Sequence, residues 1–337
     1  MIEEIPSPKP RQVIDYLQFE YKCAKCDACT FSRHQDCPPE GVFGKNALIQ
    51  TTLMKFELRL PFEKISEQME QQFGLPMTPA SALDITKRVS EYLRPKYDAT
   101  VKQVRAANVV NVDETGVKVD GKNYWVWVFV AASCTLFVVG KSRGKKVLEE
   151  VLGKDFMGYI GCDGWKVYAS FSGRLQRCWA HLLREAKALA QDYEEAEPLY
   201  LGLRRLYADL QVSLEGDPPA WVRSGLREEA EKRLLDLLLP GLHYRSREAK
   251  KFVGKVRNGF DHWFTFVVVP GIEATNNRAE RALREVVVQR KIMGTFRTEK
   301  GTWIYETMMT LTSTWKQQGL NSYETMAKSL TEAWATS

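Results

Sequence analysis

Three acidic residues stand where a carboxylate could hold a divalent cation. Asp113 ends the apolar run AANVVNVD, Asp163 ends the run MGYIGCD, and Glu280 lies in a later helical segment. A carboxylate at the mouth of a buried strand is desolvated and repelled by like neighbours, so it persists mainly when a cation compensates it. Either aspartate alone could merely cap a turn. Together with Glu280 they favour Mg²⁺, which is held by a few carboxylates, waters and substrate phosphates.

The segment 275–296, TNNRAERALREVVVQRKIMGTF, offers two interpretations of Glu280. With Asn277 as N-cap, Glu280 stands three residues later, which is the spacing of a capping box. The same carboxylate could instead be a metal ligand that faces DNA. Because a negative charge is also favoured at the positive end of a helix, one residue can serve both purposes.

Basic residues gather along this helix and just beyond it, where they outnumber the acidic ones. Such a local excess suits the binding of phosphates, although a solvated helix face or pairing with nearby acids would explain it as well. The residues that we predict to bind DNA are Arg278, Arg281, Arg284, Arg290, Lys291 and Arg297.

The N-terminal segment YKCAKCDACTFSRHQDC holds four clustered cysteines. In a chain without an export signal, such a cluster indicates a metal before a disulfide. Four thiolates in a tetrahedral arrangement suit zinc, and His34 is a further candidate ligand. The alternative is a reduced, flexible leader. The predicted zinc ligands are Cys23, Cys26, Cys29 and Cys37.

Two further pairs of residues could take part in chemistry. Cys178 and His181 are three apart at the start of a helix, so they share a face and could share a metal or a hydrogen bond. A buried thiol and a core histidine would give the same pattern. Trp165 and Trp179 could stack on a flipped base, although aromatic residues beside a strand are more often part of the core.

Composition limits the class of protein that holds these residues. The chain of 337 residues is long enough for two or three structural units, and its hydrophobic fraction of 44% and charged fraction of 27% are typical of folded soluble proteins. Its apolar runs are too short to cross a bilayer and its N-terminus lacks a signal-peptide core, so we expect a cytoplasmic protein. The net charge of +6 is weak evidence for a polyanionic partner.

Helical spacing dominates the region before the first aspartate. Segments 48–58 and 62–73 read as helices, Gly74 is a plausible stop, and a new helix is expected near Thr78 or Pro79. This order fits a helix-turn-helix module or a plain helical hairpin. In the first case the side chains that could reach phosphates are Lys87, Arg88 and Arg94.

After residue 106 the pattern changes to strands. Three apolar runs, a helix KKVLEEVLG, a strand that ends at Asp163, and a last strand in RLQRC precede the helix WAHLLREAKALAQDY. Charged helical sequence then fills the region up to the segment with Glu280. The predicted domains are a cysteine-rich segment (1–45), a helical DNA-binding-like region (46–105), the first part of an α/β catalytic core (106–192), an all-helical insertion (193–270) and the C-terminal helices of the core (271–337).

Four strings resemble the transposases of the insertion-sequence 66 family, a branch of the DDE transposases. They are NVDETGVKVDGKNYWVWVF, GCDGWKVY, RCWAHLLRE and TNNRAERALREVVVQRKIMGTFRTEKG, and the resemblance runs from about Tyr21 to near the C-terminus. It implies an RNase H-like α/β domain with an all-helical insertion. It also implies a catalytic triad of Asp113, Asp163 and Glu280 that holds two Mg²⁺ or Mn²⁺ ions.

By this resemblance the protein cleaves DNA strands at the ends of an insertion sequence and joins them to target DNA. The implied partners are double-stranded DNA, further copies of the chain on DNA, and small accessory proteins of the element; the implied location is the nucleoid. Family members usually carry a longer N-terminal region with an earlier pair of cysteines. The alternative is therefore a transposase-derived DNA-binding protein without transposition activity, and the intact set of three acids favours the enzyme.

Overall fold

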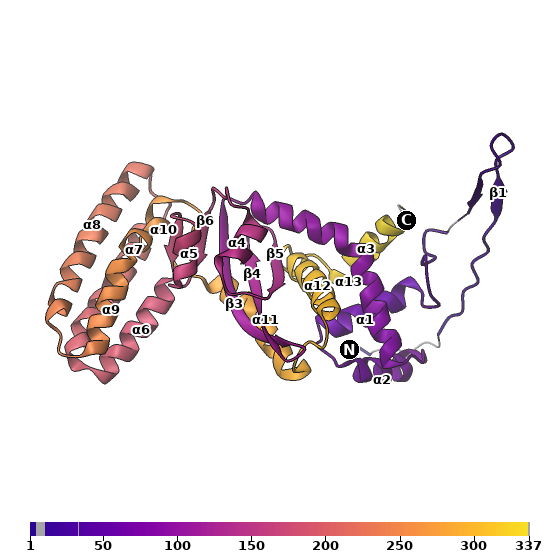
Figure 1. Ribbon diagram of the computed structural model, residues 1–337, viewed down its shortest axis with the longest axis horizontal. Helices are drawn as coiled ribbons and strands as arrows, with labels where there is room; N and C mark the ends of the chain where they lie inside the picture. The colour runs from indigo at the N-terminus through magenta and orange to yellow at the C-terminus, as the bar shows by residue number, and fades with distance from the viewer. Residues whose placement is uncertain (5–10, 33, 336–337) are drawn as a thin grey trace.

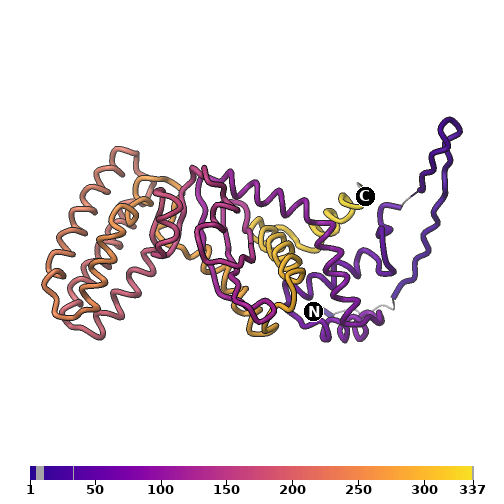
Figure 2. The backbone as a smooth tube through the Cα atoms, viewed as in Figure 1, coloured from indigo at the N-terminus to yellow at the C-terminus, as the bar shows by residue number. Residues whose placement is uncertain are grey.

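The computed structural model describes residues 1–4, 11–32 and 34–335 of the chain. Its N-terminal part forms a small antiparallel hairpin of β1 (Glu20–Lys22) and β2 (Cys29–Phe31), in which Tyr21 lies opposite Thr30. Figures 1 and 2 show that this hairpin stands away from the rest of the molecule.

Three helices follow the hairpin; the end of the second and the start of the third agree with the local signals in the sequence, whereas the first begins at Lys45 and ends at Phe56, in place of the expected 48–58. Gly74 ends the second helix in the left-handed conformation with φ 60°, and Thr78 caps the third by accepting a hydrogen bond of 3.1 Å from Ser81 N–H. The predicted restart near Thr78 is thus confirmed. The helices are α1 (Lys45–Phe56), α2 (Phe62–Phe73) and α3 (Pro79–Arg105).

Two basic residues of α3 that the sequence placed on DNA phosphates are used inside the fold. Arg88 is buried and pairs with Asp84 at 3.0 Å. The guanidinium of Arg94 lies 4.0 Å from the ring centre of Tyr97 and donates to Thr307. The expectation that Arg88 reaches a phosphate is therefore wrong, because its guanidinium is buried within the protein, whereas DNA contact by the half-buried Lys87 and Arg94 stays a prediction.

A five-stranded mixed sheet forms the centre of the molecule, in the order β5-β4-β3-β6-β7. Within this sheet β3 pairs antiparallel with β4, and β4 with β5; β6 pairs parallel with β3, and β7 pairs parallel with β6. Because parallel neighbours need crossover connections, helices link β5 to β6 and β6 to β7. The elements are β3 (Val109–Val119), β4 (Lys122–Val130), β5 (Thr135–Gly140), α4 (Lys145–Leu152), β6 (Tyr159–Cys162), α5 (Lys166–Phe171) and β7 (Leu175–Arg177).

The first strand of the sheet is longer than the sequence led us to expect. The apolar run predicts an end at Asp113, but β3 runs on to Val119 and pairs with β4 up to that residue. Asp120 and Gly121, with φ of 48° and 71°, supply the left-handed backbone of a tight two-residue hairpin turn. The parallel pairing with β6 stops at Asn111, so Asp113 lies just beyond the point where β3 loses that neighbour.

Helices cover both faces of the sheet. Alternate residues of β4 point to opposite sides, and the residues on both sides are apolar, so each face needs a cover. Val126 and Val128 belong to the core that the sheet shares with the C-terminal helices, whereas Trp127 and Phe129 belong to the core on the side of α4. The C-terminal helices are α11 (Asn277–Met293), α12 (Glu299–Gln317) and α13 (Ser322–Ala335).

The chain between β7 and α11 forms a helical bundle. This bundle lies on one side of the sheet, and the N-terminal helices lie on the other side (Figure 1). Its core is continuous with the start of α6, where Trp179 is fully buried and stacks on Tyr207 at 5.3 Å between ring centres. Base stacking by Trp179 is therefore excluded. The elements are α6 (Trp179–Asp192), η1 (Glu194–Ala196), α7 (Glu197–Ser213), α8 (Ala220–Leu238), η2 (Pro240–His243), α9 (Arg247–Asn258), η3 (Phe260–His262) and α10 (Thr265–Val268).

Helix α12 lies along the outer edge of β5 and satisfies its backbone donors. Glu306 accepts the N–H of Val139, the Thr310 hydroxyl accepts that of Phe137 at 2.9 Å, and the Thr314 hydroxyl accepts that of Thr135 at 3.1 Å. These acceptors are four residues apart on the helix, and the donors are two apart on the strand. One turn of helix thus matches each pair of strand residues.

The carboxyl group of Glu306 makes the stability of this contact pH-dependent. Burial raises its pKa from 4.5 to about 7, against the smaller opposing effects of the Val139 N–H and Arg94. The folded state therefore binds the proton more tightly than the unfolded state, and stability falls as pH rises from about 4.5 to 7. We expect Glu306→Gln to raise the unfolding free energy at pH 8 by at most about 3 kcal/mol, and to change it little at pH 4. Chemical denaturation at both pH values measures this difference, and an equal effect at the two would contradict it.

Candidate active site

The three predicted acids come from neighbouring elements around the centre of the sheet. Asp113 lies in β3, Asp163 directly follows β6, and Glu280 lies in the first turns of α11. Asp113 and Asp163 each stand two residues beyond the last parallel pair, Asn111 with Gly161. Adjacent strands are about 4.8 Å apart, so this register brings the two aspartates to the same end of the β3–β6 pair, just beyond the last paired residues.

Both burial and neighbouring negative charges act on the carboxyl group of Asp113. Burial raises the pKa of Asp113 to about 7, an effect that the Glu114 N–H bond opposes and that the charges of Glu114, Asp163 and Glu280 increase. The Asp113 carboxylate accepts the N–H of Glu114 at 2.9 Å. A cation at this position would remove the repulsion, and an all-oxygen donor set is the one that Mg²⁺ and Mn²⁺ prefer.

The three carboxylates are spread out rather than gathered on one point. Among residues 1–4, 11–32 and 34–335, the only compact trio of metal-binding side chains includes Glu280 but neither aspartate. A pair of ions about 4 Å apart distributes its ligands in this way, since no single ion needs all three acids. The three acids are therefore compatible with a two-ion site.

Glu114, beside the first aspartate, is an acid that the sequence analysis missed. Its side chain is fully buried, pairs with Arg143 at 2.6 Å, and accepts a hydrogen bond from the Tyr168 hydroxyl. The guanidinium of Arg143 in turn lies 4.3 Å from the ring centre of Trp165. The twofold period of a strand already indicates that Glu114 and Asp113 point to opposite faces. Trp165, which we considered for base stacking, is half-buried and holds this arginine.

The start of α11 differs from the predicted capping box. The N-cap is Asn276, one residue earlier than expected, and no side chain caps the helix. The Asn276 amide instead donates to the Val112 carbonyl at 2.9 Å and accepts from the Asn111 amide at 3.0 Å. The capping-box interpretation of Glu280 is therefore wrong, because Glu280 stands four residues after the N-cap and the side chain of that N-cap residue is engaged by β3. These bonds tie the helix that carries Glu280 to the strand that carries Asp113.

Gly161 makes room for this connection. A Cβ atom at that position would lie 2.5 Å from the Nδ2 atom of Asn111, its partner across the strands. Only glycine lets the Asn111 amide lie over β6 and reach Asn276. In the sequence Gly161-Cys162-Asp163, the glycine therefore leaves space for the Asn111 side chain, and the aspartate two residues later is the second predicted metal ligand.

We expect Asn276→Ala to destabilise the protein by about 2 to 4 kcal/mol, because it leaves two buried hydrogen-bonding groups without partners. The exposed neighbour provides the matched control: Asn277→Ala should change stability by less than about 0.5 kcal/mol. Denaturant unfolding of both variants tests the difference. Equal stabilities would show that the β3 connection does not hold α11.

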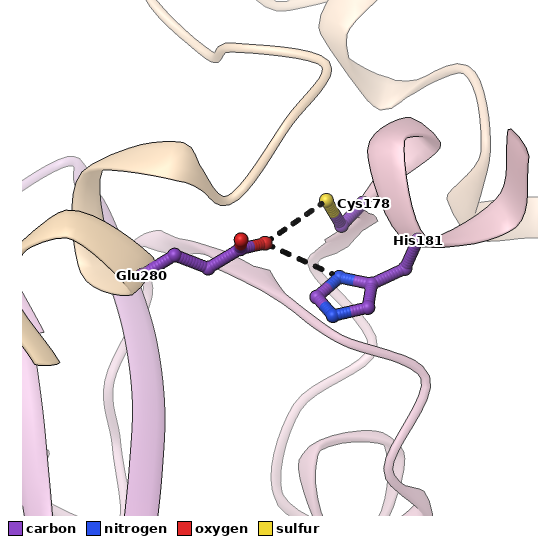
Figure 3. Close-up of side chains that lie close together, drawn as sticks. All are labelled: Cys178, His181 and Glu280. Carbon is purple, nitrogen blue, oxygen red and sulfur yellow. Dashed lines mark hydrogen bonds and ion pairs between the residues drawn. The ribbon is translucent and has the colours of Figure 1, made fainter. Parts of the chain in front are cut away.

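Cys178 and His181 contact Glu280 near the start of α11 (Figure 3). The Glu280 Oε1 atom lies 3.9 Å from the Cys178 sulfur and 3.4 Å from His181 Nδ1. Cys178 is buried and accepts the N–H of Asn276 at 3.2 Å. Arg184, one turn after His181, approaches the other oxygen of Glu280 at 3.9 Å. The sequence paired Cys178 with His181 but gave no sign that Glu280, about a hundred residues later, completes the group.

The predicted DNA-binding residues divide into two kinds. Arg278 pairs with Glu273 at 2.7 Å, and Arg290 donates to the Gly116 carbonyl, so both are held by the protein itself. The others are exposed; they are Arg281, Arg284, Lys291 and Arg297. Arg284 follows Glu280 by one turn of helix, which places its guanidinium on the side of the acidic group.

The N-terminal thiols line and follow the hairpin turn. Cys23, Cys26 and Cys29 are exposed, and Cys37 is half-buried. The N–H groups of Lys25 and Cys26 lower the pKa of Cys23, which favours the thiolate that a metal would bind. In the described part of the chain these thiols do not form a compact trio. Their joint binding of zinc remains a prediction.

Sheet order and site together define the class of the protein. A central strand flanked by two antiparallel and two parallel strands, with acids on β3, after β6 and on α11, is consistent with an RNase H-like DDE domain. The chain belongs to the family described as Transposase IS66 family, whose sequence profile matches residues 40–303, more than half of its length. No curated protein matches it.

Membership of this family implies transposition, and with it DNA binding. DDE transposases are generally phosphoryl transferases that use divalent metal ions. No helix within the described residues is long and apolar enough to cross a membrane.

Proposed function

We propose that this protein cleaves DNA strands at the ends of an insertion sequence and transfers them to target DNA, with Asp113, Asp163 and Glu280 as its catalytic carboxylates. The observation that carries the proposal is the position of Asp113: it is largely buried, which raises its pKa to about 7, and the charges of Glu114, Asp163 and Glu280 add to that effect. Structural aspartates that cap turns do not need such an arrangement. Perturbed carboxylates at one site are instead typical of metal-dependent chemistry.

Each carboxylate has a role that follows from its position. Asp113, between the other two elements, would bridge two ions, while Asp163 and Glu280 would each hold one. When bound, the ions supply Lewis acidity for the attacking and the leaving oxygen. The protein contributes the fixed geometry: the Trp165 N–H holds one oxygen of Asp163 at 2.8 Å, and the Asn276 bonds fix the start of α11.

Binding of DNA would use the exposed cations near this group. Arg281 and Arg284 are exposed on the helix of Glu280, and in the described structure Arg281 makes only a 3.2 Å bond to its own helix, at Asn277. Phosphates held there would place the scissile strand beside the acids. The partners in this proposal are the element ends, target DNA and further copies of the chain, and accessory proteins of the element could join them.

The test is strand cleavage on DNA that carries the ends of the cognate element, with Mg²⁺ or Mn²⁺. We expect nicks that expose a 3′ hydroxyl, and joining of that hydroxyl to a second DNA. The alternative, a DNA-binding protein that has lost transposition, predicts binding of the same DNA without cleavage in either metal. That outcome would overturn the enzymatic proposal.

The N-terminal hairpin leads to a prediction of its own. If Cys23, Cys26, Cys29 and Cys37 bind one ion, the reduced protein should contain about one tightly held zinc in addition to any other site, because a structural zinc is bound with a large free energy. Replacing the four cysteines by serine should remove that ion, while Cys134→Ser, at a buried thiol elsewhere, should not. Elemental analysis after desalting measures this. Zinc content that the fourfold variant leaves unchanged would contradict the prediction.

A further inference from the structure

The geometry points to a second metal site, formed by Cys178, His181 and Glu280, for a thiophilic divalent cation such as Zn²⁺. One ligand atom from each residue lies within 4.8 Å of the others. A sulfur, an imidazole nitrogen and a carboxylate oxygen are a donor set that Mg²⁺ does not favour and zinc does. This site is separate in chemistry from the all-oxygen site proposed above, although the two share Glu280.

The distances are close to those that a bound zinc ion requires. With bonds of 2.3 Å to sulfur and 2.0 Å to nitrogen or oxygen at tetrahedral angles, the sulfur and oxygen would be roughly 3.5 Å apart, and the nitrogen and oxygen roughly 3.3 Å. The Cys178 sulfur lies 3.9 Å and His181 Nδ1 lies 3.4 Å from the same oxygen of Glu280. Both distances therefore lie within a few tenths of an ångström of those in a closed site, and the sulfur and the nitrogen lie within 4.8 Å of each other.

A buried nitrogen gives independent support. In the described structure the His181 Nδ1 atom is inaccessible to solvent and makes no hydrogen bond of normal geometry, although it faces the Glu280 oxygen. A buried polar atom without such a bond is costly, and coordination of an ion would satisfy it. Figure 3 shows the imidazole and the thiol pointing to the same carboxylate from the start of α6.

The surroundings hold all three ligands in place. The Asn276 N–H donates to the Cys178 sulfur at 3.2 Å, and Arg184 approaches the second oxygen of Glu280. Such outer partners orient metal ligands and commonly affect metal affinity 10- to 100-fold. With one ligand atom from each of the three residues, a water would complete a four-coordinate site.

Occupation of this site would have a consequence for activity that rests on the proposed function. A zinc ion held by Cys178 and His181 would occupy the Glu280 oxygen that faces them, which the all-oxygen site proposed above also needs. Zinc would therefore compete with the second Mg²⁺ ion for one ligand and inhibit strand cleavage. Inhibition should be relieved by a chelator that removes zinc but leaves Mg²⁺ bound.

Cobalt spectroscopy tests the site without any assay of activity. The protein is the full chain with Cys23, Cys26, Cys29 and Cys37 replaced by serine, titrated with Co²⁺ in excess Mg²⁺. We expect one equivalent of Co²⁺ with a thiolate charge-transfer band. Cys178→Ser should abolish the band, and His181→Ala and Glu280→Gln should each weaken binding at least about tenfold. Cys134→Ser and Glu285→Gln are controls that should leave it unchanged.

Absence of the band, or its persistence after Cys178→Ser, would overturn the proposal. Full affinity in the Glu280→Gln variant would also overturn it, since the carboxylate would then not be a ligand. X-ray absorption at the zinc edge tests the same site in protein that keeps all three residues. Its result therefore does not depend on whether a variant folds. One sulfur ligand with nitrogen and oxygen neighbours is expected, and zero or two sulfurs would refute the site.

A cleavage assay with and without zinc tests the inhibition. Its outcome also separates failure of the metal-site proposal from failure of the proposed function. If the protein cleaves DNA in Mg²⁺, equimolar zinc should reduce the rate at least about tenfold, and the ratio of rates with and without zinc should approach one in the Cys178→Ser variant. Equal inhibition of both proteins would overturn the competitive role. A protein that binds cobalt as expected but cleaves no DNA would fail the proposed function and leave the metal site standing.

Discussion

Asp113→Asn, Asp163→Asn and Glu280→Gln are each expected to lower the rate of DNA strand cleavage by about a thousandfold or more. Each amide keeps the size of the side chain but removes the negative charge that would hold a divalent ion. Loss of metal-based stabilisation worth several kcal/mol corresponds to three or more factors of ten in rate. Single-turnover cleavage of DNA with the element ends measures the effect at saturating Mg²⁺.

The same variants should bind DNA nearly as well as the unsubstituted protein, because the cations that would contact phosphates remain. Asp155→Asn is the matched control, since Asp155 is exposed in the loop that leads into β6. It should cleave at the normal rate. Near-normal cleavage by any one of the three amide variants would remove that residue from the catalytic role, whatever the other two show.

The double variant Arg281→Ala/Arg284→Ala should lose a large share of its affinity for DNA of any sequence. Each phosphate contact releases counterions and contributes about 0.9 to the slope of log affinity against log salt concentration. Removal of two contacts should therefore make that slope shallower by roughly 1.8. Affinities at four or more salt concentrations measure the slope, and sequence preference should survive.

Two comparisons separate phosphate contacts from effects on the fold. Arg204→Ala/Arg205→Ala removes two exposed charges from the distant helix α7 and should leave the salt slope nearly unchanged. Arg290→Ala should instead lower the melting temperature, because Arg290 donates to the Gly116 carbonyl. If the Arg281 and Arg284 double variant melts earlier with an unaltered slope, these arginines support the fold and do not contact DNA.

Local signals in the sequence predicted much of the fold because they act over a few residues. Gly74 and Thr78 end and start helices through their own backbone and hydroxyl groups, so their effect does not depend on distant contacts. The missed half of β3 also had a local signal. The dipeptide Asp120–Gly121 between two alternating segments indicates a tight hairpin, and reading it would have extended the strand past Asp113.

The site was harder to predict, because its contacts join residues far apart in the chain. Asn276 could have capped its own helix, which is the local preference of asparagine, but the Val112 carbonyl and the Asn111 amide compete for the same side chain and win. The same applies to Arg88, whose position on a helix suggested solvent but whose buried guanidinium donates to the distant Glu40 carbonyl at 2.7 Å. A single sequence holds no information on such competition until the strands and helices are placed together.

The threonines of α12 have a consequence for how copies of this chain can associate. An open edge strand is a ready template for a strand from another molecule. On β5 the outward N–H groups are already taken by α12, and the Phe137 carbonyl accepts the hydroxyl of Tyr97. At the other edge, the Leu175 carbonyl accepts the hydroxyl of Thr265. Two copies gathered on one DNA molecule could then extend the sheet along β5 only by breaking the bonds that α12 and Tyr97 make to that strand.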